Sequence, residues 1–205
     1  MGFVKLLSEK PWLTEGCDVS DTTREEPLSF RASYFGLKIL LSVATVLFML
    51  TVIAYAYRMT FGDWKPIPEP WLLWINTGFL VLGSVGMQKA WNSAYRGYLD
   101  GLKTGMLIGG VCIIAFLIGQ CYVWEELVGT GYYASANVAA AFFYVLTAFH
   151  ALHVLGGLVA WLRASSVIWR HKSIDKVRTT VELCAIYWHF LLIVWFVLFG
   201  LMVAT

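Results

Sequence analysis

Five long apolar segments alternate with short polar connections along the chain. The segments lie at residues 34–57, 71–92, 104–124, 137–162 and 183–204. Each is long enough to cross the roughly 30 Å hydrocarbon core of a bilayer as a helix. They are continuous runs of Leu, Ile, Val, Phe and Ala without the alternation of a membrane β-barrel, so the pattern predicts helices. We therefore expect an all-α, polytopic membrane protein, with a five-transmembrane-helix bundle at 34–205 and an N-terminal arm at 1–33.

Local signals indicate where some helices end and where two of them approach closely. The connection "RMTFGDWKPIPEP", residues 58–70, holds three prolines that end the first helix. In the third connection, Ser135 or Asn137 is suited to cap the fourth helix. Gly105 and Gly109 are four residues apart at the start of the third segment, which predicts close packing against a neighbouring helix.

Composition and charge agree with a membrane protein and suggest its orientation. The chain is 59% hydrophobic and 14% charged, whereas soluble domains are about 25% charged. The net charge of +2 gives no reason to expect nucleic-acid binding. Twelve of the 15 Lys and Arg residues precede the first segment, lie in the second and fourth connections or, in the case of Lys89, lie at the end of the second segment. The positive-inside rule then predicts a multi-pass membrane protein with a cytoplasmic N-terminus and an outside C-terminus.

Three histidines are the most informative polar residues inside the segments. His150 and His153 are three residues apart, so they share one face of a helix, and His189 lies in the last segment. Three imidazoles could hold zinc, copper or haem, but no carboxylate nearby in the sequence would orient the first two. Interhelical or lipid contacts are the favoured interpretation. Because an unpartnered buried imidazole is costly, each should have a partner, such as the hydroxyl of Thr147 or Tyr187.

Other chemistry is not indicated by the sequence. No Asp or Glu lies in the interior of any segment, and the chain has no phosphate-binding loop or nucleophile motif. A small membrane transporter remains an alternative class, although it should show a midplane carboxylate or broken helices. By itself, the sequence predicts neither a catalytic centre nor a proton relay.

Two segments resemble the most characteristic parts of subunit III of haem-copper respiratory oxidases (cytochrome c or quinol oxidase subunit III). They are "FFYVLTAFHALHVLGGL", residues 142–158, and "ELCAIYWHFLLIVWFVLF", residues 182–199. These are similar to the family patterns F-H-x-L-H-V-x-x-G and E-x-x-x-x-Y-W-H-F-x-x-x-V-W. Residues 72–90 and 116–127 agree more weakly. The resemblance covers about residues 34–205, and five segments with a cytoplasmic N-terminus fit the short bacterial form of this family. The resemblance thus implies a location in the bacterial cytoplasmic (inner) membrane.

The resemblance implies an accessory subunit of a terminal oxidase, an oxidoreductase complex, without a redox centre of its own. Such a subunit supports assembly, phospholipid binding and sustained turnover of the oxygen-reducing subunit. The implied partners are oxidase catalytic subunit I, subunit II and membrane phospholipid, with haem and copper in the catalytic partner. A subunit III-like component of a nitric oxide reductase complex is the alternative within the same family. The electron donor, quinol or cytochrome c, is not indicated because its site lies on other subunits.

The resemblance also implies which residues make contacts, and it shows three departures. The expected lipid or interhelical contacts are His150, His153, Arg163, Arg178, Glu182, His189 and Trp195. Acidic residues that the family usually carries are replaced by Ala44, Val123 and Leu192. A role in assisting proton entry is therefore not carried over to these positions, and the chain is expected to belong to a divergent branch.

Overall fold

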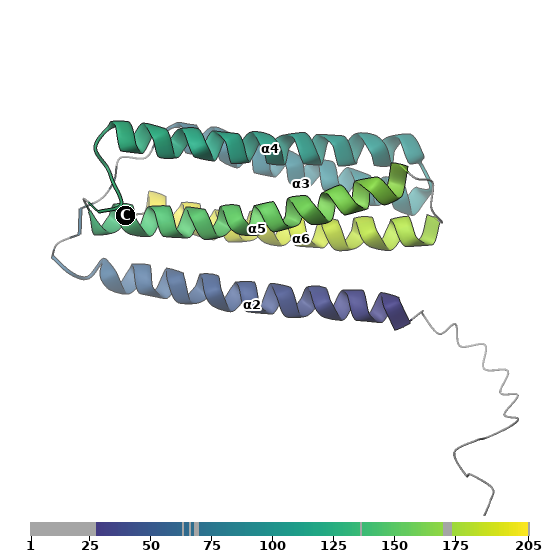
Figure 1. The fold of residues 1–205 in the computed structure, drawn as a ribbon, viewed down its shortest axis with the longest axis horizontal. Helices are drawn as coiled ribbons and strands as arrows, with labels where there is room; N and C mark the ends of the chain where they lie inside the picture. Colours follow the sequence, from purple (N-terminus) through teal and green to yellow (C-terminus); the bar gives the residue numbers. More distant parts are fainter. Residues whose placement is uncertain are drawn as a thin grey trace, which may run out of the picture.

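The described part of the chain is built from five long helices. The computed structural model describes residues 28–62, 64–65, 67, 70–135, 137–169 and 174–204. The helices are α2 (Leu28–Arg58), α3 (Leu72–Arg96), α4 (Leu99–Gly129), α5 (Val138–Trp169) and α6 (Ile174–Val203). They run up and down beside one another along the long axis of the molecule (Figure 1). This confirms the predicted all-α fold. Most of the predicted arm, residues 1–27, lies outside the described residues.

Four of the five helices have the length and apolar content of membrane spans. These stretches are Ala32–Arg58, Leu99–Gly129, Val138–Ser166 and Val177–Val203. The second predicted segment forms α3, which is less apolar because it carries polar side chains, some of them buried, such as Asn76 and Thr77, and others exposed, such as Lys89. The five-span prediction is thus supported for four helices by composition and length alone.

Turn chemistry, rather than hydropathy, sets several helix ends. Gly97 (φ 76°) and Gly131 (φ 90°) adopt left-handed conformations after α3 and α4, where glycine carries no steric penalty. After α3, Tyr98 N–H donates to the Ser93 carbonyl at 2.9 Å, which satisfies a carbonyl left free at the helix end. Asn137 caps α5 as predicted, because its Oδ1 accepts the Ala139 N–H at 3.2 Å. Helices therefore extend past the apolar segments until a turn stops them.

α3 and α4 pack backbone to backbone along a seam of glycines. A Cβ at Gly105 would lie 2.6 Å from Ala90 N, and one at Gly86 would lie 3.0 Å from Gly109 N. Only residues without a side chain permit this approach. The predicted close-packing face at Gly105 and Gly109 is confirmed. The seam fixes α3 against α4 at one register.

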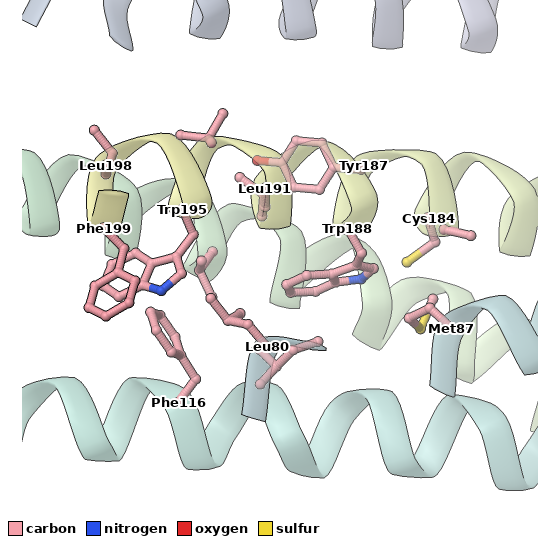
Figure 2. Packing of buried hydrophobic residues seen from close by; sticks show 14 of the residues in the cluster. Leu80, Met87, Phe116, Cys184, Tyr187, Trp188, Leu191, Trp195, Leu198 and Phe199 are labelled. Atoms are coloured by element: carbon pink, nitrogen blue, oxygen red, sulfur yellow. The ribbon is translucent and has the colours of Figure 1, made fainter. Parts of the chain in front are cut away.

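α6 lies at the centre of the bundle, and α2 lies at its edge. α6 packs against α3, α5 and α2, whereas α2 contacts only α5 and α6 within the described residues. Trp195, Leu191 and Leu198 of α6 are fully buried, and Phe116 of α4 points toward Trp195 (Figure 2). Much of α2 is exposed and apolar, and it stands apart from the other four helices (Figure 1). The core is thus formed mainly by α3 to α6.

Candidate functional site

His150 lies at the point where four helices converge. Its side chain is 0% exposed, and its ring centroid lies 6.3 Å from that of Phe48 on α2. Phe116 of α4 and Trp195 of α6 lie at 5.8 Å and 4.9 Å from the same imidazole. Among the described residues, neither ring nitrogen has a hydrogen-bond partner. The expected bond to a hydroxyl is therefore not formed, and the imidazole is enclosed by aromatic rings.

His153 has a different environment on the same face of α5. Its ring also packs on Phe48, at 5.0 Å between centroids, which agrees with the predicted shared face. Its Nδ1 lies 2.7 Å from the carbonyl oxygen of Phe149, and only the ring nitrogen can donate in this contact. The hydroxyl of Tyr187 donates to the backbone carbonyl of His153 at 2.9 Å, not to its imidazole. The ring is half-buried and lines a groove.

This groove, which we call the α2 groove, lies between α2 and the pair α5 and α6. Its volume is about 500 Å³. The lining is mostly apolar, with polar groups from all three helices. The residues are Ser33, Leu37, Leu40, Leu152, His153, Gly156, Ala160, Thr180, Leu183, Cys184 and Tyr187. Because α2 touches few neighbours, the groove is open to the surroundings of the bundle.

His189 and Trp195 occupy separate places on α6. His189 is half-buried, and its Nδ1 donates to the Ala185 carbonyl at 2.6 Å, a bond within its own helix. The Trp195 indole donates to the hydroxyl of Thr77 on α3 at 2.9 Å. Trp195 therefore makes an interhelical contact in the core, whereas the described contact of His189 is local.

The charged candidates lie toward the α5–α6 connection. The Arg178 guanidinium stacks 3.8 Å from the ring centroid of Tyr95, and its Nη2 donates to the Tyr95 carbonyl at 3.0 Å. This contact links the start of α6 to the end of α3. Arg163 is exposed on α5, and Glu182 is half-buried on α6. The structure does not pair Glu182 with either arginine among the described side chains.

Aromatic donors link the helices in a way that sequence reasoning missed. Besides the Trp195 bond, three such bonds join α4 to α5 and α5 to α6. They are Trp124 to the Thr147 hydroxyl at 3.1 Å, Trp161 to the Met106 carbonyl at 3.0 Å and Tyr187 to the His153 carbonyl. The abundance of tryptophan, ten residues in the chain, was the available signal. It could not indicate which indole finds a partner, because that depends on how the helices are rotated.

The described residues offer little to a metal ion. No three His, Cys, Asp or Glu side chains within the described ranges come together as a metal-binding group. The imidazole of His150 is surrounded by the rings of Phe48, Phe116 and Trp195, none of which is a metal ligand. The arrangement instead joins helices and borders a groove. These are the properties of a helix-packing site beside a groove.

Comparison with known proteins supplies the family. Residues 39–204 match the family model described as cytochrome c oxidase subunit III. Cytochrome c oxidase subunit 3 from Synechocystis is 35% identical over 175 residues, covering 80% of this chain and 72% of the relative. The chain belongs to the cytochrome c oxidase subunit III family. The probable cytochrome c oxidase subunit 3 of Mycobacterium tuberculosis is 31% identical over 141 residues, covering 67% of this chain and 70% of the relative. Cytochrome c oxidase subunit 3 of Corynebacterium diphtheriae is 30% identical over 176 residues, covering 78% and 85%.

This confirms the expectation that the chain is an accessory subunit III of a haem-copper oxidase, and a multi-pass bacterial membrane protein. In this chain, apolar residues occupy the three positions at which the family usually carries an acidic residue. Ala44 is 2% exposed and Val123 is 0% exposed, while Leu192 is half-buried. A carboxylate at either buried position would need a partner to offset its desolvation. The apolar side chains fill these sites without that requirement.

Proposed function

We propose that this subunit III supports assembly, holds phospholipid and sustains turnover of the oxygen-reducing subunit of its complex. The α2 groove is the observation that carries the proposal. It combines an apolar lining, which suits an acyl chain, with hydroxyl and imidazole groups that suit a lipid's polar parts. Haem and copper belong to the catalytic partner in this proposal, and this chain holds none.

A bound acyl chain would compensate for the loose packing of α2. Phe35, Val43 and Met49 on this helix are more than half exposed. In a bilayer, helices associate through close packing rather than through hydrophobic exclusion from water, so a helix with few contacts is weakly held. Lipid in the groove adds dispersion contacts to both walls. We infer that lipid is part of what holds α2 to the other helices.

We also propose that α3 crosses the membrane, so that the bundle has five spans. Only Gly97 and Tyr98 separate α3 from α4, and the two helices run antiparallel. The α3–α4 seam extends from Gly101, beside Ser93, to Gly119, beside Asn76. A helix that lies along a membrane span over that length must share its depth. Asn76, Thr77 and Ser84 on α3 are buried against its neighbours, where lipid does not reach them, whereas the exposed Lys89 and Arg96 lie toward the end of the helix.

The orientation is proposed from the distribution of positive charge. Lys89, Arg96, Lys103 and Arg178 lie toward the end of the bundle where α2 begins, whereas Arg58 lies toward the other end. The positive-inside rule places the first end in the cytoplasm. A reporter active only outside the cytoplasm, fused after Thr205, should be active. Activity of a cytoplasmic reporter at this position would reverse the assignment.

The proposed partners are catalytic subunit I, subunit II and membrane phospholipid. Family membership supports the first two, and the α2 groove supports the third. An affinity tag on this chain should recover a haem-containing complex in which the chain is stoichiometric with the catalytic subunit. Recovery of the chain without any haem-bearing partner, under conditions where the oxidase is intact, would contradict the proposal.

The lipid role is tested by filling the groove. Leu152 lines the groove, whereas Leu155 is also exposed on α5 but does not line it. Leu152→Trp should reduce phospholipid bound per purified complex and shorten the period of sustained turnover, while initial turnover is retained. Leu155→Trp adds the same bulk outside the groove and should change neither quantity. Unchanged lipid content and unchanged inactivation rate in Leu152→Trp would show that the groove does not serve this purpose.

A further inference from the structure

Three fully buried polar side chains in the bundle core have no hydrogen-bond partners. They are Asn76 on α3, Gln120 on α4 and His150 on α5, with exposed fractions of 0%, 2% and 0%. In each residue, both side-chain polar atoms lack a partner among the described residues. The hydroxyl of buried Thr147, by contrast, donates to the Phe143 carbonyl. The Trp188 indole N–H is a further buried donor without a partner among the described residues. Unpartnered amides and imidazoles are especially unfavourable in a low-dielectric interior.

The helix register brings Gln120 and His150 to opposite sides of one interface. The Trp124 indole on α4 donates to the Thr147 hydroxyl on α5, which fixes those two residues side by side. Gln120 is one turn before Trp124, and His150 is about one turn after Thr147. Because α4 and α5 run antiparallel, both steps lead in the same direction (Figure 1). Phe116, on the same face of α4 as Gln120, packs at 5.8 Å from His150 and supports this register.

Asn76 reaches the same layer from α3. Its side chain packs directly on Gly119, the residue before Gln120, where a Cβ would collide with the amide. The next residue, Thr77, accepts the Trp195 indole N–H, and the Trp195 ring lies 4.9 Å from His150. Figure 2 shows Phe116 and Trp195 pointing toward one another between α4 and α6. The three unpartnered side chains therefore occupy one level of the bundle, which we call the polar layer.

We propose that the polar layer of Asn76, Gln120 and His150 is an internal water-binding site. Each amide offers an acceptor and two donors, and a neutral imidazole offers one of each. Water can both donate and accept, and a buried water typically makes about three hydrogen bonds, which three side chains from three helices can supply. The absence of a side chain at Gly119 lets the Asn76 amide lie against α4, beside Gln120. A layer with two amides and one imidazole, and no carboxylate, matches water rather than a cation.

Such a site would fix how α3, α4 and α5 are rotated relative to one another. Rotation of any one of them would remove its polar group from the shared water and leave it unpartnered. This consequence is independent of the lipid role proposed above, because the layer is shielded from the bilayer.

The site is tested in the intact, purified oxidase complex by pulsed X-ray hydroxyl-radical labelling in ¹⁸O water. Radicals formed from a bound internal water modify the side chains next to it, while a dry core is protected. Relative to the intrinsic reactivity of each side chain toward hydroxyl radical, His150, Phe116 and Trp195 should be labelled faster than Met87, which is also 0% exposed. If the side chains of the polar layer are labelled no faster than Met87, the layer holds no water and the proposal is wrong. This outcome would also be expected if Gln120 and His150 bonded directly to one another.

A variant provides the second measurement. His150→Phe keeps a ring of similar shape but removes its polar atoms, and it should reduce labelling of Trp195 several-fold. His153→Phe makes the same change at the groove histidine and should leave labelling of Trp195 unchanged. If both variants reduce labelling equally, the water does not belong to the polar layer. If the His150→Phe complex does not assemble, the comparison with Met87 in the wild-type complex still shows whether the polar layer contains water.

Discussion

The glycine seam between α3 and α4 predicts that a single added methyl group will separate two helices. In Gly105→Ala, the new Cβ would lie 2.6 Å from Ala90 N, 2.7 Å from the Gly86 carbonyl oxygen and 2.9 Å from Ala90 Cα. All three atoms belong to the backbone, so no side-chain rotation relieves the contact. Ordinary van der Waals contact begins at 3.4 Å. The helices must therefore move apart locally.

The expected cost follows from this geometry. A gap of roughly 0.5–1 Å forfeits a quarter to a half of the dispersion energy of the atom pairs it affects. Overpacking of a well-packed interior costs about 1–3 kcal/mol, and alanine in a helix recovers up to ~1 kcal/mol relative to glycine. We expect Gly105→Ala to lower the free energy of unfolding by about 1–2 kcal/mol.

Gly78→Ala is the matched control for this prediction. Gly78 lies on α3, and a Cβ there would meet nothing within 4 Å. Its substitution should be neutral or should stabilise by up to ~1 kcal/mol. The assay is unfolding of the purified chain from mild detergent into SDS, followed by tryptophan fluorescence. Equal midpoints for the two variants would refute the conclusion that the seam depends on backbone contact.

Two further predictions concern side chains that join helices. Trp195→Phe removes a buried indole donor to α3 and should destabilise the chain by about 1–3 kcal/mol in the same assay, whereas Trp71→Phe, at a position 68% exposed, should have little effect. Arg178→Lys removes the planar stack on Tyr95 and should cost ~0.5–1 kcal/mol, while the same change at exposed Arg163 should cost nothing measurable. A midpoint for Arg178→Lys equal to that of Arg163→Lys would show that the stack contributes nothing to stability.

Hydropathy and spacing were sufficient to predict the helices and part of their packing. Continuous apolar runs predict membrane helices because the bilayer requires each backbone group to bond within its own segment. The four-residue spacing of Gly105 and Gly109 predicted a close-packing helix face. The three-residue spacing of His150 and His153 predicted that both histidines lie on the same face of one helix. Both predictions depend only on the 3.6-residue period of a helix, which is a local property.

Only the tertiary structure decided which polar residues are buried and what they contact. Asn76 and Gln120 are ordinary polar interruptions in the sequence, yet both lie in the core. His150 and His153 share a face, yet one is enclosed by aromatic rings and the other borders the α2 groove. These differences arise because each helix is rotated and translated until its small residues meet, as Gly105 does with α3. The sequence of a single helix does not determine its rotation in the bundle, because that rotation depends on how the neighbouring helices pack against it.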